Sequence, residues 1–159
     1  MILVLLGTHE LQFHRLLEEV EKCIDMGIIR EKVIVQAGNT KFKTDKMEII
    51  DYLSYNQLDD LIKNAQFIIC HGGTGSIISS VRNQKKVIVV PRLKKFNEHN
   101  DDHQMEIIKV LKEKGYIEVC LENDCLGEVI SRIDEFIPIP YSDNNALMIN
   151  TIKDFINQN

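Results

Sequence analysis

The amino-acid sequence predicts an α/β fold, a Rossmann-like parallel sheet with helices on both faces. Its short apolar runs are continuous, which is typical of strands that are covered on both faces. They alternate with stretches whose apolar residues recur at helical spacing. The runs that predict strands are residues 2–6, 33–35, 47–53, 67–70, 87–90 and 117–120. The stretches that predict helices are residues 11–26, 56–65, 75–84, 103–114, 124–137 and, beyond Pro138 and Pro140, about 142–157, with Ser142 as a possible cap.

The length and composition fit one domain that spans residues 1–159. Hydrophobic residues make up 44% of the chain and charged residues 27%, which is ordinary for a globular protein that folds without disulfides or a metal. The four cysteines form no C-x-x-C pair, so we expect reduced thiols and no zinc site. No apolar run approaches the roughly 20 residues of a membrane span, and the apolar start lacks the features of a signal peptide. We therefore expect a cytoplasmic protein.

The charge argues against nucleic acid as a partner. The net charge is −5, so the chain has no excess of basic residues to neutralise a phosphate backbone. Arg92, Lys94 and Lys95 form a weak basic run in a polar segment, residues 92–102. We expect this segment to be a solvated loop, including Glu98, Asp101 and Asp102.

The glycine-rich loop, residues 71–76 (His-Gly-Gly-Thr-Gly-Ser), is the strongest candidate site. It follows a predicted strand and opens a predicted helix, and ligands of parallel sheets bind beyond the carboxyl ends of the strands. Glycines let a ligand approach the backbone, and the free N–H groups of a helix start favour a phosphate or diphosphate. Thr74 and Ser76 add hydroxyl donors. The alternative is a tight turn with Ser76 as a plain helix cap; neither a Walker A loop nor G-x-G-x-x-G is present.

Three other loops are expected at the same edge. Residues 7–10 (Gly-Thr-His-Glu) bring a histidine and a glutamate there, although Thr8 could simply cap a helix. Gln36 ends the second strand, alternatively as no more than a strand-end polar group. His99 and His103 stand beside two aspartates, but we do not predict a metal there.

Together these motifs resemble a known family, over roughly residues 1–140. In order they are Gly7-Thr8 with Phe13, Gln36-x-Gly38, the glycine-rich loop, Val-Val-Pro91 and His103-Gln104. They resemble the carboxyl-terminal half of MurG-like GT-B glycosyltransferases, and most closely its stand-alone form. Two kinds of protein have that form. One is the catalytic subunit of the eukaryotic two-subunit N-acetylglucosaminyltransferase that acts in dolichol-linked oligosaccharide synthesis. The other is the similar PssE-type subunit encoded in bacterial exopolysaccharide and capsule clusters.

The resemblance implies a donor site for a UDP-sugar that works without a metal or other cofactor. Helix N–H groups would stabilise the departing UDP. The implied substrate-binding residues are Gly7, Thr8, Gln36, His71, Gly72, Gly73, Thr74, Gly75, Ser76, His103 and Gln104. At Ser79 the family usually carries an acidic residue that binds ribose hydroxyls, and Gln84 stands where the family usually has a glycine.

A GT-B enzyme has two such domains, so the resemblance also implies a partner. We expect a membrane-anchored subunit that binds a lipid-linked saccharide acceptor and holds this chain at the inner face of the membrane. The implied reaction is inverting transfer of a hexose, with His9 as a candidate general base for the acceptor hydroxyl. The alternatives are a non-catalytic accessory subunit of such a transferase and a different nucleotide-binding Rossmann-like module.

Overall fold

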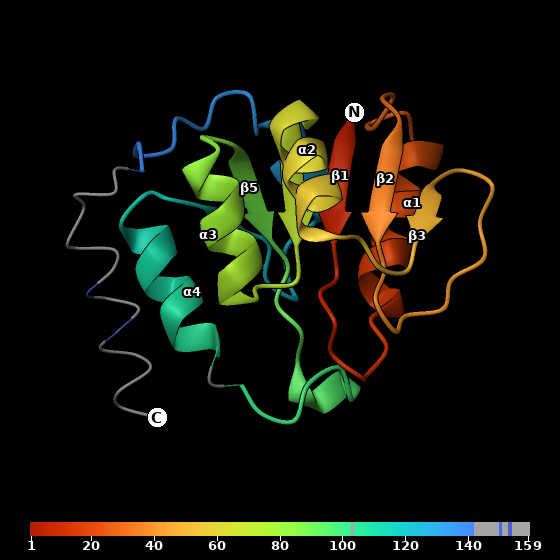
Figure 1. The fold of residues 1–159 in the computed structure, drawn as a ribbon, viewed down its shortest axis with the longest axis horizontal. Coiled ribbons are helices and arrows are strands. Elements are labelled where there is room, and N and C mark those ends of the chain that lie inside the picture. The colour runs from red at the N-terminus through yellow and green to blue at the C-terminus, as the bar shows by residue number, and fades with distance from the viewer. Residues whose placement is uncertain (103, 142–149, 151–152, 154–159) are drawn as a thin grey trace.

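The computed structural model describes residues 1–102, 104–141, 150 and 153. Its centre is a sheet of six parallel strands in the order β3-β2-β1-β4-β5-β6, so the predicted fold class is confirmed (Figure 1). The strands are β1 (Ile2–Leu5), β2 (Val33–Gln36), β3 (Glu48–Ile50), β4 (Phe67–Cys70), β5 (Lys86–Val89) and β6 (Glu118–Val119). The strand order reverses between β1 and β4, which is where Rossmann-like sheets open a crevice for ligands.

Helices cover both faces of the sheet, which explains why its strands are apolar throughout. Side chains of one strand point alternately to opposite faces. In β1, Ile2 and Val4 pack with α1 (His14–Asp25) and α5 (Leu126–Ser131). Leu3 and Leu5 pack on the other face, with the three remaining α-helices. These are α2 (Tyr55–Asn64), α3 (Thr74–Arg82) and α4 (Gln104–Glu113), which lie in front of the sheet in Figure 1.

Two helix boundaries differ from the prediction. Helix α1 begins at His14 and not near residue 11, because the N–H of Phe13 is bound by the Thr40 hydroxyl at 3.1 Å and the preceding segment forms a loop. Thr8 therefore does not cap this helix. Helix α5 ends at Ser131, and the chain continues to Phe136 through i→i+3 turns that keep Ile133 buried in the core.

The remaining predicted elements lie close to their expected positions. The short segment 47–53 contains strand β3 at the sheet edge, and a 3₁₀ helix η1 (Lys94–Phe96) interrupts the loop after β5. The predicted helix over 142–157 lies outside the described residues apart from 150 and 153. Within the described part of the chain, no helix is long and apolar enough to cross a membrane.

Candidate functional site

A pocket of about 370 Å³ opens at the carboxyl ends of β1 and β4, where the strand order reverses. We call it the α2–α3 pocket. The end of β2, the loops after β1, β3 and β4, and residues of α2 and α3 contribute to its wall. The lining residues are Gly7, Thr8, Gln36, Tyr52, Leu53, Leu58, Ile62, His71, Gly73, Gly75, Ser76 and Ser79. Seven of the residues predicted to bind substrate are therefore brought together here.

Helix α3 begins at this pocket with its backbone donors free. Gly73 is the residue before the helix, and no side chain caps it, so the alternative role of Ser76 as a cap is wrong. The first backbone bond of the helix runs from the N–H of Ile77 to the carbonyl of Gly73. The N–H groups of Thr74, Gly75 and Ser76 have no acceptor among the described residues. Such a helix start attracts an anion.

His71 forms the inner end of the pocket between two glycines. A Cβ on Gly7 would lie 2.6 Å from His71 Cε1, and a Cβ on Gly73 would lie 2.3 Å from His71 Nε2. His71 Nδ1 lies 3.0 Å from the carbonyl oxygen of Leu5, which can only accept, so Nδ1 carries the proton. Burial lowers the pKa of His71 to about 4. The ring is therefore neutral at pH 7, and its Nε2 is a hydrogen-bond acceptor.

Two predicted binding residues have structural roles: Gln36, which lines the pocket, and Gly72, which does not. The Gln36 amide accepts from the N–H of Gly7 at 3.2 Å and donates to the carbonyls of Gly7 at 3.0 Å and Asp51 at 3.2 Å. Gly72 has a φ of +95°, and a Cβ there would lie 2.7 Å from Ile108 Cδ1 of α4. Gln36 thus joins the end of β2 to the loops after β1 and β3, and Gly72 lets α4 approach the sheet.

The other predicted residues do not line this pocket. Thr74 contributes its backbone N–H at the helix start, and Gln104 is the first residue of α4. His103 lies outside the described residues. His9 stands against His99, with ring centroids 4.6 Å apart.

The hydrogen bonding of His9 limits what it can do. Its Nδ1 accepts from the N–H of Leu11 at 3.1 Å, so in the neutral ring the proton sits on Nε2. Burial, followed by the neighbouring His99, lowers the pKa of His9. In this conformation the neutral ring presents a donor at Nε2, and a general base would need the other tautomer.

The expectation of a solvated loop over 92–102 is wrong for Arg92 and Glu98. Each side chain is buried, with 4% of the residue exposed. The guanidinium of Arg92 donates to the carbonyls of Leu6 at 3.0 Å, Leu11 at 2.8 Å and Glu98 at 3.1 Å. Burial lowers the pKa of Arg92 to about 10, and the Glu98 carboxylate opposes that shift.

Glu98 completes this connection between two loops. Its carboxylate accepts from Arg15 through two bonds, of 2.9 and 2.8 Å, and from the N–H of Leu93 at 3.0 Å. The loops after β1 and β5 are thereby tied together, although β4 separates these strands in the sheet. We call this network the Arg92–Glu98 bridge. The sequence carries no local signal for it, because the contacts that join the two loops connect residues more than 75 positions apart.

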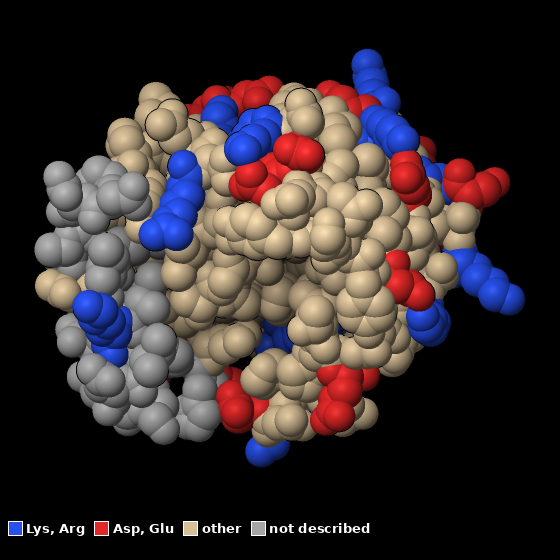
Figure 2. Space-filling view, in the orientation of Figure 1, with Lys and Arg blue, Asp and Glu red and all other residues tan. Residues whose placement is uncertain are grey.

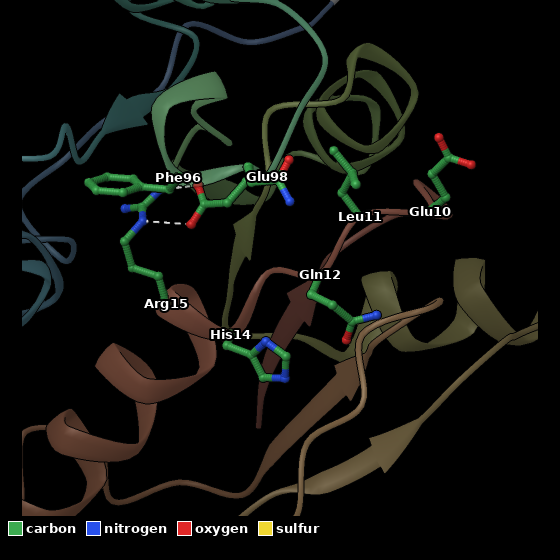
Figure 3. Close-up of a pocket in the computed structure, with 8 residues that line it drawn as sticks. Glu10, Leu11, Gln12, His14, Arg15, Phe96 and Glu98 are labelled. Atoms are coloured by element: carbon green, nitrogen blue, oxygen red, sulfur yellow. Dashed lines mark hydrogen bonds and ion pairs between the residues drawn. The ribbon is translucent and has the colours of Figure 1, made fainter.

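A second pocket, of about 390 Å³, lies beside this bridge (Figure 3). We call it the α1 pocket. It is lined by Glu10, Leu11, Gln12, His14, Arg15, Phe96, Asn97 and Glu98. Its polar side chains are largely bonded to the protein: Gln12 accepts from the N–H of Lys41 at 2.9 Å, and His14 Nε2 lies 2.8 Å from the Lys41 carbonyl. Across the described residues, no cluster of three or more His, Cys, Asp or Glu side chains could hold a metal ion.

Proteins with sequences similar to this chain are known. The chain is 29% identical over 111 residues to the UDP-N-acetylglucosamine transferase subunit ALG13 of Debaryomyces hansenii, covering 67% of this chain and 51% of the relative. It is 28% identical over 114 residues to the Saccharomyces cerevisiae protein of the same name, covering 67% of this chain and 54% of the relative. The chain thus spans about half the length of these relatives.

Solved structures share the fold. An NMR structure of ALG13 matches with a TM-score of 0.60 at 22% identity, covering 96% of both chains. The crystal structure of Acinetobacter baumannii MurG matches with a TM-score of 0.55 at 18% identity, covering 83% of this chain and 40% of MurG. The model of the glycosyltransferase family 28 C-terminal domain matches residues 1–159. This chain therefore belongs to the glycosyltransferase family 28 C-terminal domain family.

Proposed function

We propose that this chain is the donor-binding catalytic subunit of a two-subunit inverting glycosyltransferase, which uses a UDP-sugar and a polyprenyl-diphosphate-linked saccharide. The observation that carries the proposal is the free start of α3 at the α2–α3 pocket. Three N–H groups that have no acceptor among the described residues meet the Ser76 hydroxyl there, beside glycines that leave the backbone accessible. They are the donors that a nucleoside diphosphate needs, with no metal required.

The rest of the pocket suits the nucleoside. An apolar wall is formed by Leu53, Leu58 and Ile62. The half-exposed Tyr52, next to Leu53 in the chain, also lines the pocket. The Tyr52 hydroxyl donates to Asn39 at 2.7 Å, which holds the ring at the pocket. A planar base stacks favourably on such a surface. The pocket thus combines a polar end for the diphosphate and an apolar side for the base.

In the proposed reaction an acceptor hydroxyl attacks the anomeric carbon of the donor sugar. The bond from that carbon to the UDP oxygen breaks, UDP departs with the electron pair, and the hydroxyl proton passes to a general base. His9 remains the candidate base in this chain, in the tautomer that leaves Nε2 unprotonated. In the assembled enzyme, His9→Ala should then lower kcat strongly with little change in donor KM; unchanged turnover removes His9 from this role.

The relatives support a partner subunit and suggest the first sugar to test. The curated relatives are named as subunits of a UDP-N-acetylglucosamine transferase. We propose that a membrane-anchored subunit supplies the acceptor side and holds this cytoplasmic chain at the membrane. N-acetylglucosamine is the first donor sugar to test. A hexose, in exopolysaccharide or capsule synthesis, is the alternative that the PssE-type resemblance suggests.

Calorimetric titration of nucleotides into the purified chain tests the donor role. We expect UDP to bind at one site and more tightly than GDP or ADP. If UDP does not bind at millimolar concentration, the donor role fails and a non-catalytic accessory subunit is the better description. A preference for another nucleotide would instead assign the chain to a different nucleotide-binding module. Transfer assays with radiolabelled UDP-sugars in membranes that contain the co-expressed partner then identify the sugar.

A further inference from the structure

We infer that the α2–α3 pocket binds the pentose of its nucleotide only through neutral groups, with Ser79 at the pentose, and so prefers ribo- over 2′-deoxyribonucleoside diphosphates by less than tenfold. This inference rests on the proposed function and adds a substrate class to it. It starts from the composition of the pocket wall: among the described residues that line it there is no Asp, Glu, Lys or Arg, and His71 is neutral at pH 7. Figure 2 shows the molecule from the side of α2, α3 and α4. The centre of the face drawn there is uncharged, and the charged groups lie mainly toward its margins.

The position of Ser79 follows from helix geometry. Ser76 and Ser79 both line the pocket and stand three residues apart on α3, so they lie on one side of the helix about 4.5 Å apart along its axis. That distance is close to the spacing between a phosphate and the pentose next to it. A diphosphate at the start of α3 therefore places the pentose beside Ser79, on the way to the apolar wall formed by Leu58 and Ile62.

The Ser79 hydroxyl is available for this contact. Within the described part of the chain it has no hydrogen-bond partner, whereas the neighbouring Ser80 is fully buried and donates to the Ser76 carbonyl at 2.7 Å. Ser79 is also partly exposed. Water can therefore hydrogen-bond to the Ser79 hydroxyl when a ligand has no 2′-hydroxyl. Removing the ligand's 2′-hydroxyl thus leaves no buried polar group without a hydrogen-bond partner.

Nearby carboxylates are engaged elsewhere. Asp59 adjoins Leu58 in α2, but its side chain pairs with Lys63 at 2.5 Å and lies 3.4 Å from the Asn83 amide. Asp51 adjoins Tyr52 and pairs with Lys41 at 2.7 Å. The pocket therefore offers the pentose a hydroxyl in place of a carboxylate.

The difference between these acceptors sets the expected selectivity. A hydrogen bond between neutral groups changes affinity by roughly two- to tenfold, whereas a bond to a charged group is worth roughly ten- to a hundredfold. With Ser79 at the pentose, removal of the 2′-hydroxyl should weaken binding less than tenfold. A carboxylate introduced at this position should raise the selectivity for ribose.

The test is calorimetric titration of UDP and 2′-deoxy-UDP into the wild-type chain, Ser79→Asp and Ser79→Ala, with Ser76→Ala as the matched control. The readout is the ratio of the two Kd values, because a new negative charge near the diphosphate weakens both ligands together. We expect a ratio below ten in the wild type, a ratio at least threefold higher in Ser79→Asp, and wild-type-like ratios in Ser76→Ala.

The outcomes separate the two claims. A wild-type ratio of ten or more, with UDP bound, overturns the inference and leaves the proposed function standing. An unchanged ratio in Ser79→Asp, in a variant with wild-type circular dichroism, overturns the placement of Ser79 at the pentose. If neither nucleotide binds the wild type, the proposed function itself fails.

Discussion

The two pockets at the carboxyl edge of the sheet have similar volumes, but their polar groups are bonded differently. In the α1 pocket, the side chains of Gln12, His14, Arg15 and Glu98 are bonded to other parts of the protein. In the α2–α3 pocket, the N–H groups at the start of α3 and the Ser79 hydroxyl have no partner among the described residues. Polar groups satisfied by the protein stabilise loops, whereas uncommitted donors are available to a ligand. Pocket volume alone would not distinguish the two.

The largest effect we expect comes from breaking the Arg92–Glu98 bridge. Arg92→Met removes the donors to the buried carbonyl of Leu6 and the partly buried carbonyl of Leu11 and leaves both acceptors without a described partner. The loss should be about 3 kcal/mol in the free energy of unfolding, which lowers Tm by roughly 10 °C. Thermal unfolding measures it, with the exposed Lys95→Met as the control. Equal Tm values for the two variants would show that the bridge does not stabilise the loops.

A second effect should appear in the pH dependence of stability. His71 has a pKa of about 4 in the folded chain and 6.5 when unperturbed, because burial disfavours the charged ring. Between these values the unfolded chain holds more protons, so the free energy of unfolding falls as pH drops from about 6.5 to 4. His71 alone can account for about 3 kcal/mol of this loss.

The variant His71→Gln isolates this contribution, since glutamine does not titrate. We expect the variant to be less stable at pH 7 but to lose less stability than the wild type between pH 6.5 and 4.5. Urea unfolding at a series of pH values measures both slopes. Parallel slopes would mean that His71 is not held neutral in the folded chain.

The third comparison lies within the glycine-rich loop. Gly73→Ala places a Cβ 2.3 Å from the His71 ring, so the ring must move, whereas a Cβ on Gly75 meets nothing within 4 Å. We expect Gly73→Ala to weaken UDP binding more than tenfold. Gly75→Ala should keep or raise Tm, because alanine favours a helix by about 0.5–1 kcal/mol over glycine. Calorimetry and thermal unfolding distinguish them, and identical behaviour of the two variants would contradict this account of the loop.

The smallest expected effect concerns one hydroxyl. Ser76→Ala removes a single donor from the α2–α3 pocket and should weaken UDP binding by about 1 kcal/mol, roughly fivefold, with Tm unchanged. Equal UDP affinity in calorimetry would argue against a contact between Ser76 and the diphosphate.

The sequence predicted the features that depend on local pattern. Continuous apolar strands and helical spacing predicted the sheet and its two helix layers, and glycines after β4 predicted the free helix start. It did not predict features that depend on distant partners. Glu98 reads as a solvated residue until Arg15, 83 residues away, is placed beside it. The tautomers of His9 and His71 likewise follow from backbone groups that only the fold brings near.

The most direct test of the central claim is an amide-resolved NMR titration of UDP into the ¹⁵N-labelled chain. The account predicts the largest shifts at the N–H groups of Thr74, Gly75 and Ser76, with smaller ones at Gly7 and Thr8 and none at Phe96 and Asn97 in the α1 pocket. Shifts confined to the α1 pocket, or no shift at the start of α3 at saturating UDP, would contradict it.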